Sequence, residues 1–211
     1  MKVVHLSNSN GGGAGRAAYR IHKSLIKIGL NSEMWVNVAT NNDNSVKLPK
    51  NITSKFITFV RRNAKKLISM TFKTKNPILH SPSFLSSSWV KKINSSDADV
   101  VNLHWVQHEM LSVSDISKIK KPLVWTLHDM WGFCGAEHVS WDKRWKNGYY
   151  SSNRPSHENG FDLNKWTWQR KKKYWTKPIQ IITPSNWLTE HVKQSKLMKN
   201  WPCKTIPNAI D

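Results

Sequence analysis

Residues 122–129 read Pro-Leu-Val-Trp-Thr-Leu-His-Asp, an apolar run that ends abruptly in a titratable pair. A short, continuously apolar run is typical of a central strand in a parallel sheet that is covered on both faces. Open α/β sheets bind ligands at the carboxyl ends of such strands. The stretch therefore predicts a parallel sheet with His128 and Asp129 at its ligand-binding edge. It leaves open whether His128 is a hydrogen-bonded core residue or a chemical centre.

Strand and helix signals alternate on both sides of this stretch. The expected strands cover residues 3–7, 34–38, 98–105, 123–127, 179–183 and 204–206. The expected helices cover residues 16–28, with Gly29 as the stop, 114–120, and 185–196, with Ser185 as the cap. This alternation predicts an α/β fold with a doubly wound, Rossmann-like parallel sheet. We expect one domain over residues 1–206.

Two segments interrupt the alternation. The first, about 50–75, contains a basic amphipathic helix expected over 52–72, and the second is a long loop of about 132–162. Long loops in compact domains are often functional. The basic helix suits an ordinary surface helix, docking on an anionic membrane, or nucleic-acid binding. We expect a membrane contact through its basic side chains, which are Lys55, Arg61, Arg62, Lys65 and Lys66.

Charge and composition restrict the class of protein. The chain has 33 basic and 13 acidic residues, a formal net charge of +20, and no acidic residue lies between positions 46 and 96. Such a surface favours an anionic partner. No stretch of 18 apolar residues predicts a spanning helix, and the first residues are too quickly polar for a secretory signal. With only two cysteines, we expect a reduced, cytoplasmic protein without a disulfide framework.

A glycine loop follows the first expected strand. Residues 11–15 read Gly-Gly-Gly-Ala-Gly and are followed by Arg16. Main-chain N–H groups beside a helix N-terminus suit a phosphate or carboxylate, although a tight turn alone also needs glycine. Arg16 stands where a dinucleotide fingerprint needs its third glycine, and no acidic residue ends the second strand. The loop therefore predicts anion binding without a nicotinamide cofactor.

Polar side chains follow several of the other strands. His104 and Trp105 end one expected strand, His128 and Asp129 end another, and Ser185 follows a third. Because the carboxyl ends of parallel strands meet at one edge, we expect these residues to converge with the glycine loop. His128 suits a hydrogen-bond donor or proton carrier. Asp129 would either orient His128 or cap the following turn.

Other chemistry is weakly supported. The His-x5-Cys-x3-His spacing of His128, Cys134 and His138 matches no usual zinc spacing, so we expect no metal. Neither cysteine is a convincing nucleophile, and a Gly-x-Ser-x-Gly elbow is absent. A basic cluster at residues 170–173, with tryptophans nearby, suits a membrane surface or single-stranded nucleic acid. The twelve tryptophans suit sugar stacking, core packing or interfacial anchoring.

Five segments together resemble a known family. They are Gly-Gly-Ala-Gly-Arg-Ala-Ala at 12–18, Asp-Val-Val-Asn-Leu-His-Trp at 99–105, the stretch 122–133 with His-Asp-Met-Trp, Thr-Pro-Ser-Asn-Trp-Leu at 183–188, and Ile-Pro-Asn-Ala-Ile-Asp at 206–211. In this order they resemble the N-terminal half of glycosyltransferase family 4. The branch that builds capsular and colanic-acid-like polysaccharides is the most similar.

The resemblance implies two Rossmann-like domains that face each other across a cleft, the B-type glycosyltransferase fold. The first domain binds mainly the acceptor, and the second binds a nucleotide-sugar. It implies transfer of a hexose with retained configuration, without a metal or other cofactor. Gly12 and Gly13 would approach the donor diphosphate or sugar, and Arg16 would contact phosphate or acceptor. His128 would lie beside the transferred sugar, with His104, Trp105, Asp129 and Ser185 as acceptor contacts or supporting residues.

The sequence also departs from the family pattern. Residues 207–211 resemble the start of a linker, and no second Rossmann unit or paired-glutamate motif follows. We therefore expect activity to need a C-terminal donor domain, in cis or in a partner chain. The acceptor would be a saccharide or lipid-linked, at the inner face of the cytoplasmic membrane. The alternative is a non-catalytic module that binds anionic lipid, saccharide or nucleic acid, of which nucleic acid is the least favoured.

Overall fold

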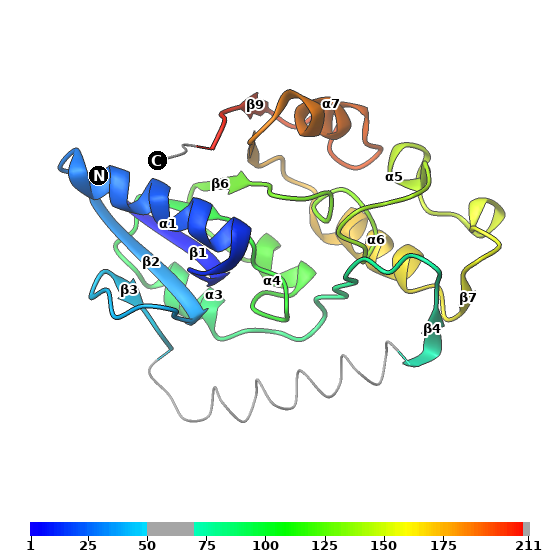
Figure 1. Cartoon of the computed structure of the whole chain (residues 1–211), viewed down its shortest axis with the longest axis horizontal. Helices are drawn as coiled ribbons and strands as arrows, with labels where there is room; N and C mark the ends of the chain where they lie inside the picture. The colour runs from blue at the N-terminus through cyan, green and yellow to red at the C-terminus, as the bar shows by residue number, and fades with distance from the viewer. Residues whose placement is uncertain (50–69, 209–211) are drawn as a thin grey trace.

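The computed structural model describes residues 1–49 and 70–208 (Figure 1). A seven-stranded sheet has the order β3-β2-β1-β5-β6-β8-β9, and every neighbouring pair is parallel. Its strands are β1 (Lys2–Ser9), β2 (Asn31–Val38), β3 (Val46–Lys47), β5 (Val100–Leu103), β6 (Leu123–Thr126), β8 (Gln180–Thr183) and β9 (Cys203–Thr205). The strand order reverses between β1 and β5, which is the switch point of a doubly wound sheet.

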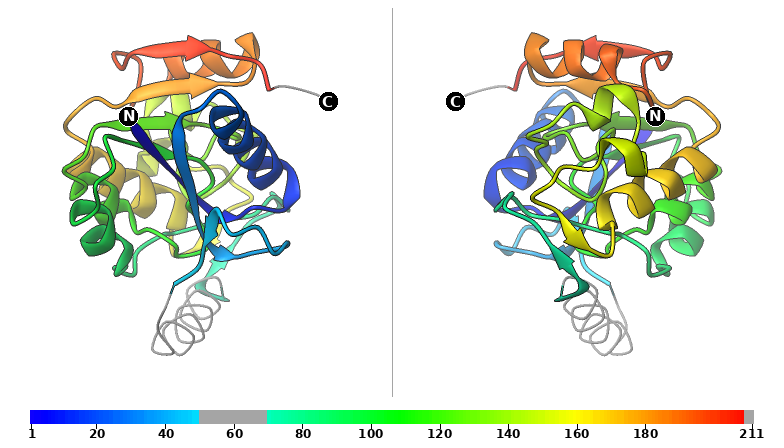
Figure 2. Two further views of the ribbon diagram at one scale, coloured as in Figure 1. Left: turned by 90° about the vertical axis from the view of Figure 1, so that its left-hand side faces the viewer. Right: turned by 90° about the vertical axis from the view of Figure 1, so that its right-hand side faces the viewer.

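The helices cover the sheet on both faces, with α1 on one face and α4 and α6 on the other (Figure 2). They are α1 (Gly12–Lys27), α3 (Trp89–Asn94), α4 (Val113–Ser117), α5 (Arg144–Asn147), α6 (Leu163–Tyr174) and α7 (Asn186–Gln194), with a 3-10 turn η1 (Ser151–Asn153). A small antiparallel sheet joins β4 (Phe72–Lys73) to β7 (Asn159–Gly160). The prediction of a doubly wound, Rossmann-like α/β fold is confirmed.

The two faces of the central strands differ in chemistry. Registered partners in a parallel sheet point to the same side, and Leu6, Leu103 and Trp125 are registered neighbours on the face that packs into the main apolar core. On the opposite face, under α1, His5 is registered with Asn102. The core therefore lies mostly on one side, and polar groups line the other.

The sequence predicted the type of the main helices and strands correctly, but their first and last residues less accurately. The strand expected over 98–105 covers only Val100–Leu103, and the helix expected over 114–120 covers only Val113–Ser117. Gly29 ends α1 as expected, with a φ of 81° that favours glycine. Strands β3, β4 and β7 were not expected. Each has only two residues, and its pairing depends on a distant partner.

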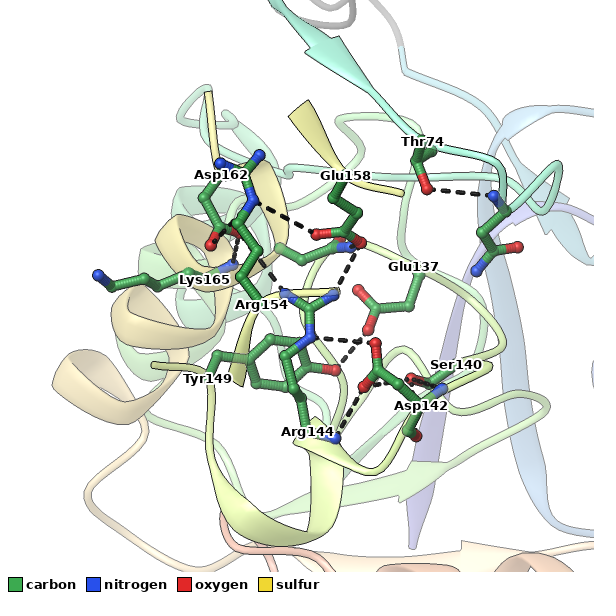
Figure 3. A network of polar contacts seen from close by, with 12 residues as sticks. Thr74, Glu137, Ser140, Asp142, Arg144, Tyr149, Arg154, Glu158, Asp162 and Lys165 are labelled. Carbon is green, nitrogen blue, oxygen red and sulfur yellow. Dashed lines mark hydrogen bonds and ion pairs between the residues drawn. The ribbon is translucent and has the colours of Figure 1, made fainter. Parts of the chain in front are cut away.

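The long loop expected over 132–162 is organised by a network of charged side chains (Figure 3). At its centre Arg144 is buried and contacts the equally buried Glu158 at 2.7 Å and Asp142 at 3.1 Å. Asp162 lies 3.8 Å from the same guanidinium, and Arg154 lies 3.7 Å from Asp162. These ion pairs therefore join the loop from Asp142 to Asp162. It also contains α5, η1 and β7.

The basic cluster at 170–173 is exposed only in part, at Lys172 and Lys173, which narrows the predicted surface for a membrane or nucleic acid. Lys171 is fully buried and donates to the main-chain carbonyls of Trp131, Cys134 and Gly135. Its ammonium lies 3.8 Å from the centroid of the Trp131 ring. Arg170 also donates to main-chain carbonyls of a neighbouring segment. Two of the four side chains therefore support the fold, which leaves a smaller basic surface for a partner.

The basic helix expected over 52–72 lies largely outside the described residues, as do Lys55, Arg61, Arg62, Lys65 and Lys66. Phe72, at its expected end, lies in β4 instead. Among the residues that the structure describes, no helix is long and apolar enough to cross a membrane. Most of the tryptophans pack in the core, whereas Trp141 and Trp187 are exposed.

Candidate functional site

The expected convergence at the carboxyl edge of the sheet is observed. Strands β1, β5 and β6 are neighbours, and the segments that follow β1 and β5 are joined by a hydrogen bond from Asn8 N–H to Trp105 O at 2.7 Å. His104 N–H donates to Leu6 O at 2.8 Å. His104 and His128 therefore follow adjacent strands, at the same edge of the sheet as the N-terminus of α1. We call this edge the rim.

The glycine loop is shorter than expected, because α1 begins at Gly12 and takes up most of residues 11–15. Gly11 is the N-cap, and no side chain caps the helix. The first turn contains no acidic residue. Its N–H groups therefore remain oriented for an anion at the positive end of the helix dipole.

The glycines of this turn have different reasons to be glycine. A Cβ on Gly15 would lie 2.4 Å from Ser9 O, so Gly15 allows α1 to pack closely on the end of β1. Gly12 has a φ of 67°, which favours glycine. Gly13 has neither constraint, and a Cβ there would meet nothing within 4 Å among the described residues. Open space at Gly13 is what close approach of a ligand to the main chain requires.

Arg16 lies beside this turn and is exposed, with its Nε donating to Gly12 O at 3.2 Å. The hydrogen bond folds the side chain back over the helix N-terminus. A fixed positive charge there adds to the helix dipole, as expected for a group that contacts phosphate.

Three histidines form a hydrogen-bonded row across the three central strands. His5 Nδ1 lies 3.0 Å from His104 Nε2, and His104 Nδ1 lies 3.1 Å from His128 Nε2. His5 and His104 are buried, whereas His128 is half-buried. Sequence reasoning missed His5, although a histidine within the apolar first strand was a visible signal. We call these residues the histidine row.

Burial keeps the histidine row neutral. It lowers the pKa of His5 to about 3 and the pKa of His128 to about 4, although nearby Asp129 opposes the shift at His128. Burial also lowers the pKa of His104 well below its usual value, and both neighbouring histidines add to this effect. The row is therefore a set of neutral imidazoles at pH 7.

We expect acid to destabilise the domain through this row. In the unfolded chain the histidines titrate near pH 6.5, so as the pH falls the unfolded state binds protons first and the free energy of unfolding decreases. The loss runs from about pH 6.5 downward and reaches about 1.4 kcal/mol per pH unit for each histidine that stays neutral when folded. Urea unfolding of wild type and His5→Gln at several pH values measures it, and the variant should show the shallower dependence. Parallel curves would contradict the prediction.

Asp129 does not orient His128; it caps the next turn and binds other groups. Its Oδ1 accepts from Trp131 N–H at 2.9 Å, and its Oδ2 accepts from Trp105 Nε1 at 3.0 Å. Its Oδ2 also lies 2.6 Å from His138 Nδ1. Burial raises the pKa of Asp129, but these hydrogen bonds outweigh it and the net pKa is lowered. An ionised carboxylate therefore holds together three segments at the rim.

His138 continues this contact to Ser81, with Nε2 and Oγ 2.9 Å apart. Serine, histidine and aspartate thus lie in the order of a hydrolytic triad. Ser81, however, is completely buried, and its main chain pairs with Ala136 and Trp131. Because a nucleophile must reach its substrate, we interpret this chain of contacts as structural.

Ser185 caps α7, as expected, with its Oγ accepting from Leu188 N–H at 3.2 Å. Its hydroxyl therefore has a structural role. Trp105 is half-buried and packs edge-on against His108 with ring centroids 4.6 Å apart. Within residues 1–49 and 70–208, no group of histidine, cysteine and acidic side chains could hold a metal ion. Cys134 is fully buried, and burial raises its pKa, which does not suit a nucleophile.

A separate hollow of about 890 Å³ lies beside β3. Its lining includes Trp35, Asp43 and Lys92, and it reaches Thr40 and Asn41, which hydrogen-bond to Asn10, but it includes none of residues 11–16, His104 or His128. The rim remains the better candidate because its groups come from several strand ends.

A doubly wound sheet with an uncapped glycine turn and a neutral histidine row at its switch point has the architecture of a ligand-binding α/β domain, in which ligands bind at the carboxyl edge. The family model described as Glycosyltransferase Family 4 matches residues 11–211, and the chain belongs to this family. It is therefore a glycosyltransferase domain, and the family implies a nucleotide-sugar donor and an acceptor. Its sheet is consistent with the N-terminal domain of the B-type fold. A search of the curated proteins finds no match.

Proposed function

We propose that the rim binds the sugar diphosphate of a nucleotide-sugar and the acceptor that receives the sugar. The observation that supports this is that His128, which follows β6, and the uncapped first turn of α1, which follows β1, lie at the same carboxyl edge of the sheet with only β5 between their strands. Helix N–H groups stabilise diphosphate charge, and a half-buried imidazole at the same edge would contact the transferred sugar. Gly12 and Gly13 would approach the donor, with Arg16 beside the phosphate.

The acceptor would be a saccharide or a lipid-linked saccharide, and the sugar would be a hexose transferred with retained configuration. This rests on the resemblance to the branch that builds exported polysaccharides. Trp105 offers a half-buried aromatic face near the rim, next to His104. The nucleotide would be bound by a second domain, in cis or in trans, without which we expect no transfer.

The net charge of +20 favours a location at an anionic surface, which we propose is the inner face of the cytoplasmic membrane. It also supports a second function, a non-catalytic module that docks on anionic lipid. Binding to anionic but not neutral vesicles, without a response to nucleotide-sugars at residues 11–16, would favour that second function.

A titration tests the binding role of the glycine turn. Addition of UDP-, GDP- and dTDP-hexoses to the ¹⁵N-labelled chain should shift the amide signals of Gly12, Gly13 and Arg16, and inorganic sulfate at equal ionic strength is the control. Gly13→Val should weaken the response at least about tenfold, equivalent to about 1.4 kcal/mol, because the new side chain fills the space for the ligand. Ser24→Val, on the exposed side of the same helix, should not.

Urea unfolding of wild type and Gly13→Val without ligand checks that the substitution does not destabilise the domain. Because nothing described lies within 4 Å of a Cβ at position 13, Gly13→Val should unfold at the same urea concentration as wild type or a higher one. Amide shifts that appear only at lysines outside residues 11–16 would contradict the role of the glycine turn. Equal affinity of Gly13→Val and Ser24→Val for the nucleotide-sugars would contradict it too.

A further inference from the structure

The direction of hydrogen bonding along the histidine row can be deduced from its far end. A neutral imidazole has one N–H and one lone pair. His104 contacts His5 through Nε2 and His128 through Nδ1, so it donates to one neighbour and accepts from the other. All the protons in the row therefore point in the same direction, either toward His128 or away from it.

The two directions differ in whether His5 Nε2 carries a proton or a lone pair. If the protons point away from His128, His104 donates to His5 Nδ1 and the proton of His5 lies on Nε2. That atom is buried and has no hydrogen-bond partner among the described residues. If the protons point toward His128, the same atom carries only a lone pair.

The nearest aromatic neighbour does not change this comparison. His22 packs edge-on against His5 with ring centroids 5.9 Å apart. Both of its ring nitrogens are already bonded, to Ser32 Oγ at 2.7 Å and to Ser45 Oγ at 2.9 Å. It therefore offers no lone pair to a His5 Nε2–H. A buried N–H without an acceptor is much rarer in proteins than an acceptor with unused capacity.

We propose that His5 and His104 are positioning residues that hold His128 in the tautomer with its proton on Nδ1. His5 Nδ1–H donates to His104 Nε2, and His104 Nδ1–H donates to His128 Nε2. The other ring nitrogen of His128, Nδ1, then carries the proton and can donate a hydrogen bond to a ligand. It suits an oxygen that gains negative charge, such as a sugar hydroxyl or a phosphate oxygen, and it does not suit removal of a proton.

This inference deepens the proposed function, on which the role of the outward nitrogen rests, but the tautomer itself is independent of sugar transfer. Correlation of ring protons with ring nitrogens in the ¹⁵N-histidine-labelled chain measures it directly. His128→Gln identifies the His128 signals among those of nine histidines. We expect a protonated Nδ1 and an unprotonated Nε2 on His128 at pH 7.5. A protonated Nε2, or nitrogen shifts averaged between the two tautomers, would overturn the inference.

Variants of His104 test the cause. His104→Phe removes the donor to His128 and should change its tautomer ratio about fivefold, as expected for the loss of one neutral hydrogen bond. His104→Asn places an amide donor near the position of Nδ1 and should restore the wild-type ratio. The matched control is His22→Gln, which replaces a buried histidine outside the row and should leave the His128 signals unchanged.

The outcomes separate the two claims. An unchanged tautomer in His104→Phe would show that the row does not hold His128, whatever the domain binds. If that variant does not fold, His5→Gln and the wild-type spectrum still decide the direction of the row. A protonated Nδ1 together with no response of residues 11–16 to nucleotide-sugars would keep this inference and reject the proposed ligand.

Discussion

His128→Ala is expected to lower kcat for sugar transfer about 100- to 1,000-fold, the usual loss for one hydrogen-bond donor aimed at developing charge. Under the proposed function, the measurement uses the chain together with a donor-binding domain, in cis or in trans. KM for the nucleotide-sugar should change much less, because the helix N-terminus and Arg16 remain in place. A loss of this kind in kcat assigns His128 to the transition state.

Two variants make the result specific. His128→Gln retains an amide donor and should keep more activity than the alanine variant. The control is His191→Ala on α7, where the imidazole stacks on Trp145 and donates its Nδ1–H to Trp187 O, away from the rim. Turnover that stays at the wild-type level in His128→Ala would remove this residue from the mechanism.

Arg144→Met is expected to lower the free energy of unfolding by about 3–5 kcal/mol, the usual loss when one partner of a buried ion pair is removed. Both Arg144 and Glu158 have side chains that are only 2% exposed. Without the guanidinium, Glu158 keeps the hydrogen bond from Asn164 Nδ2, but its nearest cation in the described part of the chain is Arg154 at 3.9 Å instead of Arg144 at 2.7 Å. Urea unfolding followed by tryptophan fluorescence measures the change.

The comparison variant is Lys193→Met, which removes an exposed ion pair with Glu190 and should cost no more than about 1 kcal/mol. A double variant, Arg144→Met with Glu158→Leu, should recover part of the loss, because no carboxylate is then left buried opposite an apolar side chain at position 144. Equal stability of Arg144→Met and Lys193→Met would show that the network does not support the loop.

The arrangement of the rim was predictable because it follows from topology. Once the alternation of strands and helices indicated a parallel sheet, the carboxyl ends of its strands had to meet, and with them the glycine loop, His104 and His128. The partners of each side chain were not predictable in the same way. Asp129 had two local interpretations, and its contacts with Trp105 and His138 depend on segments that the sequence alone does not bring together.

Two other residues show what periodicity does and does not reveal. Lys171 falls on the same helical face as Trp168 and Trp175, and this spacing of three and four residues is a signal for an inward-facing lysine that the interpretation of 170–173 as a basic cluster missed. His5 was harder, because a single histidine in an apolar strand does not reveal its neighbours. Its contact with His104 depends on which strand lies beside β1, and that is a property of the whole sheet.

The contacts of Asp129 have a consequence for ligand binding. One carboxylate fixes Trp105, the turn at Trp131 and the loop at His138, and Gly15 fixes how closely α1 approaches β1. The rim is thus preorganised, so a ligand would lose little affinity to the ordering of side chains on binding. Selectivity among ligands at this edge would come from shape and hydrogen-bond polarity that exist before the ligand arrives.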